Sequence, residues 1–193
     1  MKAPLLTALL LAVATLAAAA VPSGDGLPLS AANAEAKKRC PGSKRSPKKI
    51  KVTGAQRLVI CLVNKRREAR GLRRLKRQKS ISKAASRHTR QMRGSGCFAH
   101  RCSGEPDLTG RLTRADYIPC GCSWNAGENI AWGKGKKSGS PAKVVRAWMR
   151  SSSHRATLLG SGLEHIGVGF RRGSPYSGKK KLATYTIDVG YRR

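Results

Sequence analysis

The chain has 193 residues, of which 40 are Lys or Arg and only 9 are Asp or Glu, and its formal net charge is +31. This length suits one domain with its own core and flanking extensions, and it leaves little room for a second domain. So positive a field favours anionic partners, such as cell-envelope polymers or lipids, while charge alone would also allow nucleic acid. The alternative is a solvated, arginine-rich surface with no dedicated partner, because the cations are spread over the whole chain.

The amino terminus predicts export. Met1-Lys2 is a short positive start, and residues 3–20 are almost entirely Ala, Leu, Val and Thr, which is typical of a secretory signal peptide. Cleavage is expected after residue 20, or at small residues as late as 36. The alternative is a retained membrane anchor, but the apolar run is marginal for a span, which needs about 20 residues.

Residues 21–52 predict a basic tail that contains Pro, Ser and Ala and offers few apolar groups to bury. We expect this tail to be flexible until Cys40 ties it down, and we expect the folded domain to occupy residues 53–193.

All the cysteines follow the signal segment, and their even number favours disulfides in an exported protein. They are Cys40, Cys61, Cys97, Cys102, Cys120 and Cys122. We expect Cys40–Cys61 to attach the tail to the first helix, and the other four allow three pairings that the sequence does not separate. The alternative is a metal site that includes His100, but the spacings Cys-x4-Cys and Cys-x-Cys do not match the usual zinc knuckles.

The first half of the domain predicts helices. One helix is expected from about residue 54 to 70, with Gly71 as its stop. A second begins at Ser80 as its cap and ends at Gly94. Its apolar stripe consists of Ile81, Ala84, Ala85, His88 and Met92.

A histidine on such a stripe is usually a satisfied core residue, so His88 is expected to be structural, and so is His165. A short helix capped by Asp107 should follow the loop that carries His100.

The second half predicts a loop over 134–139, then a helix that starts at Ser140-Pro141 and closes over residues 151–155. Residues 166–170 and 183–189 alternate with period two and predict two half-buried strands, joined by a hairpin loop over 171–181. Helices first and an antiparallel pair last indicate an α+β layer fold.

Between these halves lies Gly127-Glu128-Asn129-Ile130-Ala131-Trp132-Gly133, whose glutamate is the only acidic residue between Asp116 and Glu164. A carboxylate in a cationic surrounding stays ionised and can hold a metal or a histidine. The alternative is a structural hydrogen-bond acceptor at a junction between loop and strand.

Residues from about 58 to 191 resemble the CAP superfamily (cysteine-rich secretory proteins, antigen 5 and pathogenesis-related proteins, also called SCP-like), and its bacterial branch most. The motifs that carry this resemblance, in the family's order, are Asn64-x-x-Arg67-x-x-x-Gly71-Leu72, Ile81 through Met92, Phe98-Ala99-His100, Gly127 through Gly133, Trp148-Met149-x-Ser151-x-x-His154-Arg155, Ile166-Gly167-Val168-Gly169 and Tyr185-Thr186.

The resemblance implies an α-β-α sandwich, with helices flanking an antiparallel sheet, and a cleft lined by His100, Glu128 and His154. The chain departs from the eukaryotic pattern of two histidines and two acidic residues. Ser151 stands where those members have their second glutamate, and Thr184 where they have their second histidine. Two imidazoles and a carboxylate form a reasonable zinc set with one open position, in which Ser151 would support His154.

Three functions follow as hypotheses. The first is a monomeric binding module, acting outside the cell or at the envelope through its cleft, its cationic surface or both. The second is a zinc-dependent hydrolase that uses His100, Glu128 and His154, although the chain has no His-Glu-x-x-His or Gly-x-Ser-x-Gly motif. The third is a cationic membrane-active protein, although its apolar helix faces are needed for the core. The same three side chains could instead form a purely structural network.

Overall fold

The computed structural model describes residues 40–118 and 121–193, which fold around one four-stranded sheet. The expected signal peptide and most of the expected tail lie outside the described residues. The elements, in chain order, are η1 (Pro47–Lys49), α2 (Val52–Glu68), β1 (Lys76–Arg77), α3 (Lys79–Ser95), α4 (Leu108–Thr113), β2 (Trp124–Lys134), α5 (Gly135–Ser138), α6 (Pro141–Arg150), α7 (Ser152–Leu159), β3 (His165–Arg172) and β4 (Leu182–Arg192).

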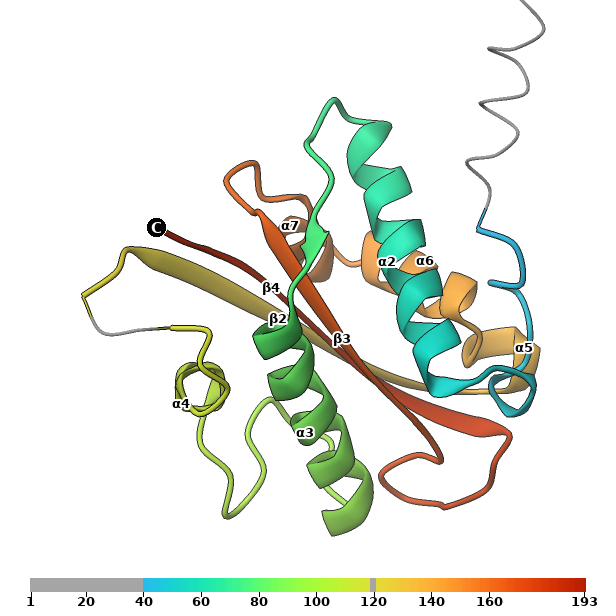
Figure 1. Ribbon diagram of the computed structural model, residues 1–193. Helices are drawn as coiled ribbons and strands as arrows, with labels where there is room; N and C mark the ends of the chain where they lie inside the picture. The colour runs from blue at the N-terminus through green and yellow to red at the C-terminus, as the bar shows by residue number, and fades with distance from the viewer. Residues whose placement is uncertain (1–39, 119–120) are drawn as a thin grey trace, which may run out of the picture. The chain divides into compact units, whose positions relative to one another are not determined.

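The sheet has the strand order β1-β3-β4-β2, and β4 pairs antiparallel with both β3 and β2. The two-residue β1 pairs parallel with β3, so the sheet is mixed, not wholly antiparallel as expected. Figure 1 shows α2, α6 and α7 on one side of the sheet and α3 on the other. The predicted α+β sandwich is therefore confirmed.

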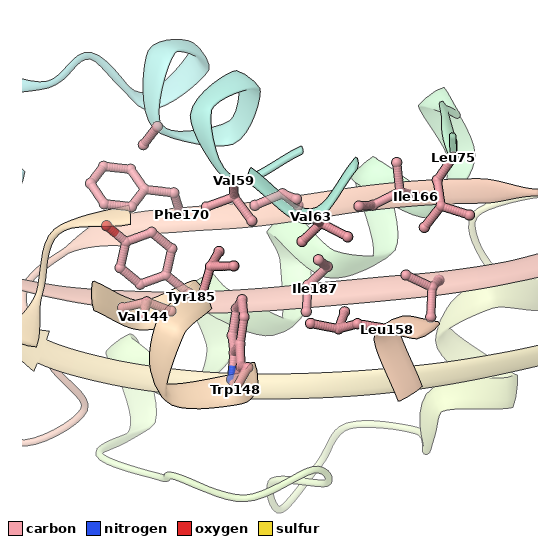
Figure 2. Packing of buried hydrophobic residues seen from close by; sticks show 14 of the residues in the cluster. Val59, Val63, Leu75, Val144, Trp148, Leu158, Ile166, Phe170, Tyr185 and Ile187 are labelled. Atoms are coloured by element: carbon pink, nitrogen blue, oxygen red, sulfur yellow. The ribbon is translucent and has the colours of Figure 1, made fainter. Parts of the chain in front are cut away.

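Both faces of the central strand are covered, which corrects the expectation of half-buried strands. Residues 182–190 of β4 are all buried. On the first face, Val59 and Val63 of α2 and Trp148 of α6 pack against Ile166 and Ile187 of the sheet, as Figure 2 shows. The indole nitrogen of Trp148 donates to the carbonyl of Ile130 at 3.1 Å, so its one polar group is satisfied in the core.

The second face is covered by α3, whose predicted apolar stripe is fully buried. Two glycines of β3 let this helix lie close to the sheet. A Cβ atom added at Gly167 would lie 2.2 Å from the Ile81 side chain, and one at Gly169 would lie 2.1 Å from Thr89 Oγ1. The alternation of glycine with Ile, Val and Phe in β3 therefore marks the face on which a helix docks.

The ends of α3 differ from the prediction. Its first turn is capped by the side chain of Gln78, which accepts from the backbone N–H groups of Ser80 and Ile81, so Ser80 is not the cap. Gly94 lies inside the helix, and Gly96, with a left-handed φ of 69°, ends it. Asp107 caps α4 as predicted, because its side chain accepts from the N–H of Gly110 at 2.8 Å.

The helix predicted from Ser140-Pro141 is α6, with proline at its first position. The Ser140 side chain donates to the carbonyl of Lys136 instead of capping the helix. The chain leaves the helical conformation at Ser151 (φ −87°, ψ 128°) and re-enters it as α7. Residues 134–139, predicted as a loop, contain the end of β2 and the short α5.

The described part of the expected tail, residues 40–52, packs on the domain, and its last residue begins α2. The predicted disulfide Cys40–Cys61 is present and ties it to α2. The backbone N–H of Ala142 donates to the carbonyl of Ser43 at 3.0 Å, and Ile50 is buried in the core. A second disulfide joins Cys97 to Cys102, which fits one of the three pairings left open, and Cys120 lies outside the described residues. Within the described ranges, no helix is long and apolar enough to cross a bilayer.

Candidate functional site

Glu128 lies in the middle of β2, not at a junction between loop and strand. Its side chain is 3% exposed and points toward the α3 side of the sheet, where both oxygens are engaged. Oε1 lies 2.7 Å from Nδ1 of His100, and Oε2 lies 2.6 Å from a guanidinium nitrogen of Arg111. His100 is 61% exposed, so the pair reaches from the sheet to the surface.

Arg111 holds the loop that carries His100 against Glu128. These three residues belong to one cluster, which also includes His88, Glu105 and Asp188. Arg111 lies on α4, its side chain is 3% exposed, and besides Glu128 it donates to the backbone carbonyls of His100 at 2.8 Å and Pro106 at 3.2 Å. No sequence pattern distinguishes Arg111 from the many other arginines, so it was not predicted. A buried guanidinium that binds a carboxylate and two carbonyls fixes the orientation of these three groups.

His88 is fully buried on the stripe of α3, as predicted, but it is also part of this cluster. Its Nδ1 lies 2.7 Å from Oε2 of Glu105, and its Nε2 lies 3.7 Å from Oε2 of Glu128. Glu105 comes from the loop between α3 and α4 and was not predicted as a site residue. The scarcity of acidic residues was the available signal, because each one in so basic a chain is a candidate for a specific contact.

Asp188 completes the cluster and was also not predicted. It is fully buried on β4, directly opposite Glu128 in the antiparallel register. Among the described residues, no N–H group donates to its oxygens, and the side chain that interacts with it is the carboxylate of Glu128. Burial, and then the negative charge of Glu128, raise the pKa of Asp188 well above its ordinary value of 3.8, so the protonated form is favoured.

The pKa values of the paired groups move in opposite directions. The hydrogen bond with Glu128 raises the pKa of His100 above its ordinary value of 6.5 and outweighs the opposing effect of burial. Burial pushes the pKa of Glu128 upward, but the hydrogen bond with His100 and the nearby His88 and Arg111 lower it overall. Both shifts favour an ion pair between imidazolium and carboxylate.

His154 and Ser151 are held together elsewhere. Nδ1 of His154 lies 2.7 Å from Oγ of Ser151, although the helix breaks at Ser151, between α6 and α7. The backbone carbonyl of His154 accepts from the side chain of Asn129 at 2.9 Å, which joins α7 to β2. None of the contacts of the His154 imidazole reaches His100 or Glu128.

The donor set expected for zinc does not fit a metal centre in this arrangement. Both oxygens of Glu128 are engaged by His100 and Arg111, and the guanidinium stands where a metal cation would have to approach. Across residues 40–118 and 121–193, no group of three or more His, Cys, Asp and Glu side chains is placed to hold a metal ion.

Two adjoining pockets open beside the cluster, and both are lined by arginine. We call them the arginine pockets. One has a volume of about 380 Å³ and is lined by Arg87, Arg90, Arg111 and Arg114. The other, of about 510 Å³, is lined by Arg101 and Arg114, and the two pockets share residues 104–106 and Arg114 in their lining.

Comparison with known proteins gives a family for this architecture. The CAP family model, described as the cysteine-rich secretory protein family, matches residues 61–187. Two curated proteins of Bacillus subtilis (strain 168) are similar in sequence: the uncharacterized protein YkwD is 34% identical over 121 residues, and the uncharacterized membrane protein YlbC is 32% identical over 127 residues. These matches cover 62% and 65% of this chain but only 43% and 34% of the two relatives.

Solved structures show the same fold. An extracellular protein containing an SCP domain from Bacillus anthracis str. Ames superposes with a TM-score of 0.58 at 24% identity, over 72% of this chain and 40% of that one. An outer surface protein of Borrelia burgdorferi also gives 0.58, at 19% identity, over 71% of this chain and 92% of that one.

Proposed function

Because the chain belongs to the cysteine-rich secretory protein (CAP) family and is of the bacterial type, we propose that it is an exported binding module that acts outside the cell or at the envelope. Its ligand carries an anionic group, which enters the arginine pockets beside the cluster that contains Glu128, His100 and Arg111. The cluster itself positions the loop between α3 and α4 that forms the pocket walls.

The observation that carries this proposal is that, on this side of the sheet, the carboxylates are buried and paired whereas most arginines of the pockets have no carboxylate partner among the described residues. The carboxylates of Glu105 and Glu128 are turned inward and are occupied by His88, His100 and Arg111. Apart from Arg111, the pocket arginines have no carboxylate partner among the described residues. The guanidinium of Arg87 donates to the carbonyl of Arg114 at 3.3 Å and that of Arg101 to the carbonyl of Glu105 at 3.4 Å, and neither contact neutralises the positive charge. Guanidinium groups suit carboxylate or phosphate.

Export is supported by two kinds of observation. The sequence begins with a positive start and an apolar run typical of a signal peptide. The folded domain contains the disulfides Cys40–Cys61 and Cys97–Cys102, which persist in oxidising compartments.

Neither alternative function gains a specific observation. The expected hydrolytic set is divided between the Glu128–His100 contact and the separate His154–Ser151 contact. The apolar stripes of α3 and α6 are buried against the sheet, so the folded protein does not present them to a bilayer.

The proposal is tested by calorimetric titration of the disulfide-intact protein with soluble peptidoglycan fragments, whose stem peptides carry carboxylates. The double variant Arg90→Gln/Arg114→Gln removes two pocket charges. We expect its affinity to fall about tenfold or more, because charge-assisted hydrogen bonds are each worth about 1.5–3 kcal/mol.

The matched control is Arg77→Gln/Lys79→Gln, which removes the same charge from exposed positions near the start of α3. This control should bind like the wild type. Equal affinity of all three proteins, or loss of equal size in both variants, would show that the arginine pockets are not the site.

A further inference from the structure

A second cationic surface lies on the opposite side of the sheet, far from the arginine pockets in the fold. It is an open groove of about 1130 Å³ between residues 40–45, α2 and α6, and we call it the amino-terminal groove. Figure 1 shows the first described residues, in blue, descending beside α5. Lys44 and Arg45 line the groove from this segment, and α2 and α6 supply two further cations each.

The walls of the amino-terminal groove are fixed by covalent and buried contacts. The Cys40–Cys61 disulfide joins the segment to α2, and the hydrogen bond from Ala142 to Ser43 joins it to α6. Ser43 and Ser140 are both buried. A groove held open in this way needs little ordering when a ligand binds, which favours affinity.

No acidic side chain of the described residues neutralises the cations along the groove. The pairs Lys65–Arg66 on α2 and Lys143–Arg146 on α6 are exposed, and within the described ranges none of the four has an acidic partner. Every described carboxylate is committed elsewhere: Glu68 to Arg74, Asp116 to Lys83, Glu164 to Arg193, Asp107 to the α4 cap, and Glu105, Glu128 and Asp188 to the cluster.

The residues that line the groove beside the cations of α2 and α6 restrict the class of ligand that it can bind. Pro41, Leu62 and Ala142 are apolar members of the lining, and no aromatic side chain of the described residues lines the groove. Binding of single-stranded nucleic acid relies on aromatic platforms on which the bases stack, and the described groove has none. Lys and Arg both bind phosphate. The Lys ammonium supplies a compact positive charge, and the planar Arg guanidinium can donate two parallel hydrogen bonds.

We propose that the amino-terminal groove binds a flexible, phosphate-bearing strand without aromatic bases, with its phosphates on the cations of α2 and α6 and its backbone against the apolar members of the lining. This site is separate from the arginine pockets, so the strand and a ligand carrying a single anionic group can bind at the same time.

The test uses inorganic polyphosphate as the probe and measures affinity across a range of salt concentrations. The variant Lys65→Gln/Lys143→Gln/Arg146→Gln changes only exposed side chains. We expect it to bind polyphosphate at least tenfold more weakly, and the slope of log affinity against log salt to fall by about two, because each phosphate contact contributes about 0.7. The control Arg77→Gln/Lys79→Gln/Lys180→Gln removes the same charge from exposed sites outside the groove and should keep both values.

Two results would overturn the proposal. If the control loses as much affinity as the groove variant, binding follows net charge and the groove is no site. If an oligothymidylate with the same number of phosphates binds the wild type as tightly as polyphosphate, the groove has no preference for a strand without bases. The variant Arg90→Gln/Arg114→Gln should bind polyphosphate normally, which separates this test from that of the arginine pockets.

Discussion

At the scale of single residues, the unusual feature is a pair of carboxyl groups that face each other across the β2–β4 ladder. Glu128 is satisfied by His100 and Arg111, whereas the buried oxygens of Asp188 receive no N–H donor from the described residues and face the carboxylate of Glu128. The two groups therefore respond to pH in opposite ways, and each gives a prediction about stability.

We predict that Asp188→Asn stabilises the protein, and more so at pH 7 than at pH 4. The folded-state pKa of Asp188 is raised, so between its unfolded and folded pKa values the native state binds more protons than the unfolded state. Stability of the wild type is therefore lost as pH rises from about 4. Asparagine mimics the protonated group without its cost of ionisation, so we expect a clear gain in stability at pH 7 and little gain at pH 4.

Urea unfolding at the two pH values measures this gain. Asp116→Asn is the matched control, because Asp116 is an exposed aspartate for which the gain should be close to zero. A gain for Asp188→Asn that is absent at pH 7, or equal at both pH values, would contradict the prediction.

We predict that Glu128→Gln destabilises the fold by about 3 kcal/mol, because it leaves the buried guanidinium of Arg111 without its carboxylate. The wild-type contribution should be present above the ordinary pKa of 4.5 and disappear as pH falls through the lower folded pKa of Glu128. Glu164→Gln, which breaks the more exposed pair with Arg193, should cost much less, because water and salt screen that pair. Chemical denaturation compares the two, and equal costs would rule out a special role for Glu128.

The sequence located part of this site and missed the rest for a physical reason. The isolation of Glu128 from other acidic residues and the family motif that contains His100 could be recognised in the sequence. Asp188 was not, because its alternation with Ile187 and Val189 places it on a face that the sequence alone treats as solvated. Only the covering layer of α3 makes that face an interior.

At the scale of elements, the docking of α3 on β3 decides whether that interior exists. The close approach depends on Gly167 and Gly169, and the buried stripe of α3 carries His88 to within 3.7 Å of Glu128. The helices and strands themselves followed from apolar periodicity. The ends of α3 did not, because a glutamine cap and a glycine in the helix interior are poorly marked in sequence.

We predict that Gly169→Ala destabilises the domain by about 3 kcal/mol, since the added methyl group would lie 2.1 Å from Thr89 Oγ1 and 2.2 Å from the carbonyl of Ala85. Gly94→Ala is the control, because a methyl group there meets nothing within 4 Å and the helix gains about 0.5–1 kcal/mol. Thermal unfolding monitors both variants. A stable Gly169→Ala protein would mean that α3 does not dock as closely as described.

At the scale of the whole molecule, the sequence predicted the sign and size of the charge but not its placement. Periodicity and motif order were sufficient for the sandwich, because the apolar stripes and the family motifs specify the same layers. The distribution of cations depends on which carboxylates turn inward, and that requires the tertiary contacts of Glu105, Glu128 and Asp188. These contacts leave arginine in the pockets and mixed Lys and Arg along the amino-terminal groove.

The most direct test of the central claim is an NMR titration of protein labelled with 15N at arginine side chains, using soluble peptidoglycan fragments at about 0.15 M salt, where long-range charge effects are screened. If the arginine pockets form the binding site, the side-chain signals of Arg90, Arg101 and Arg114 should shift in a saturable way, while that of Arg77 stays unchanged. Shifts of equal size at all exposed arginines, or saturable binding that appears only after zinc is added, would contradict the account.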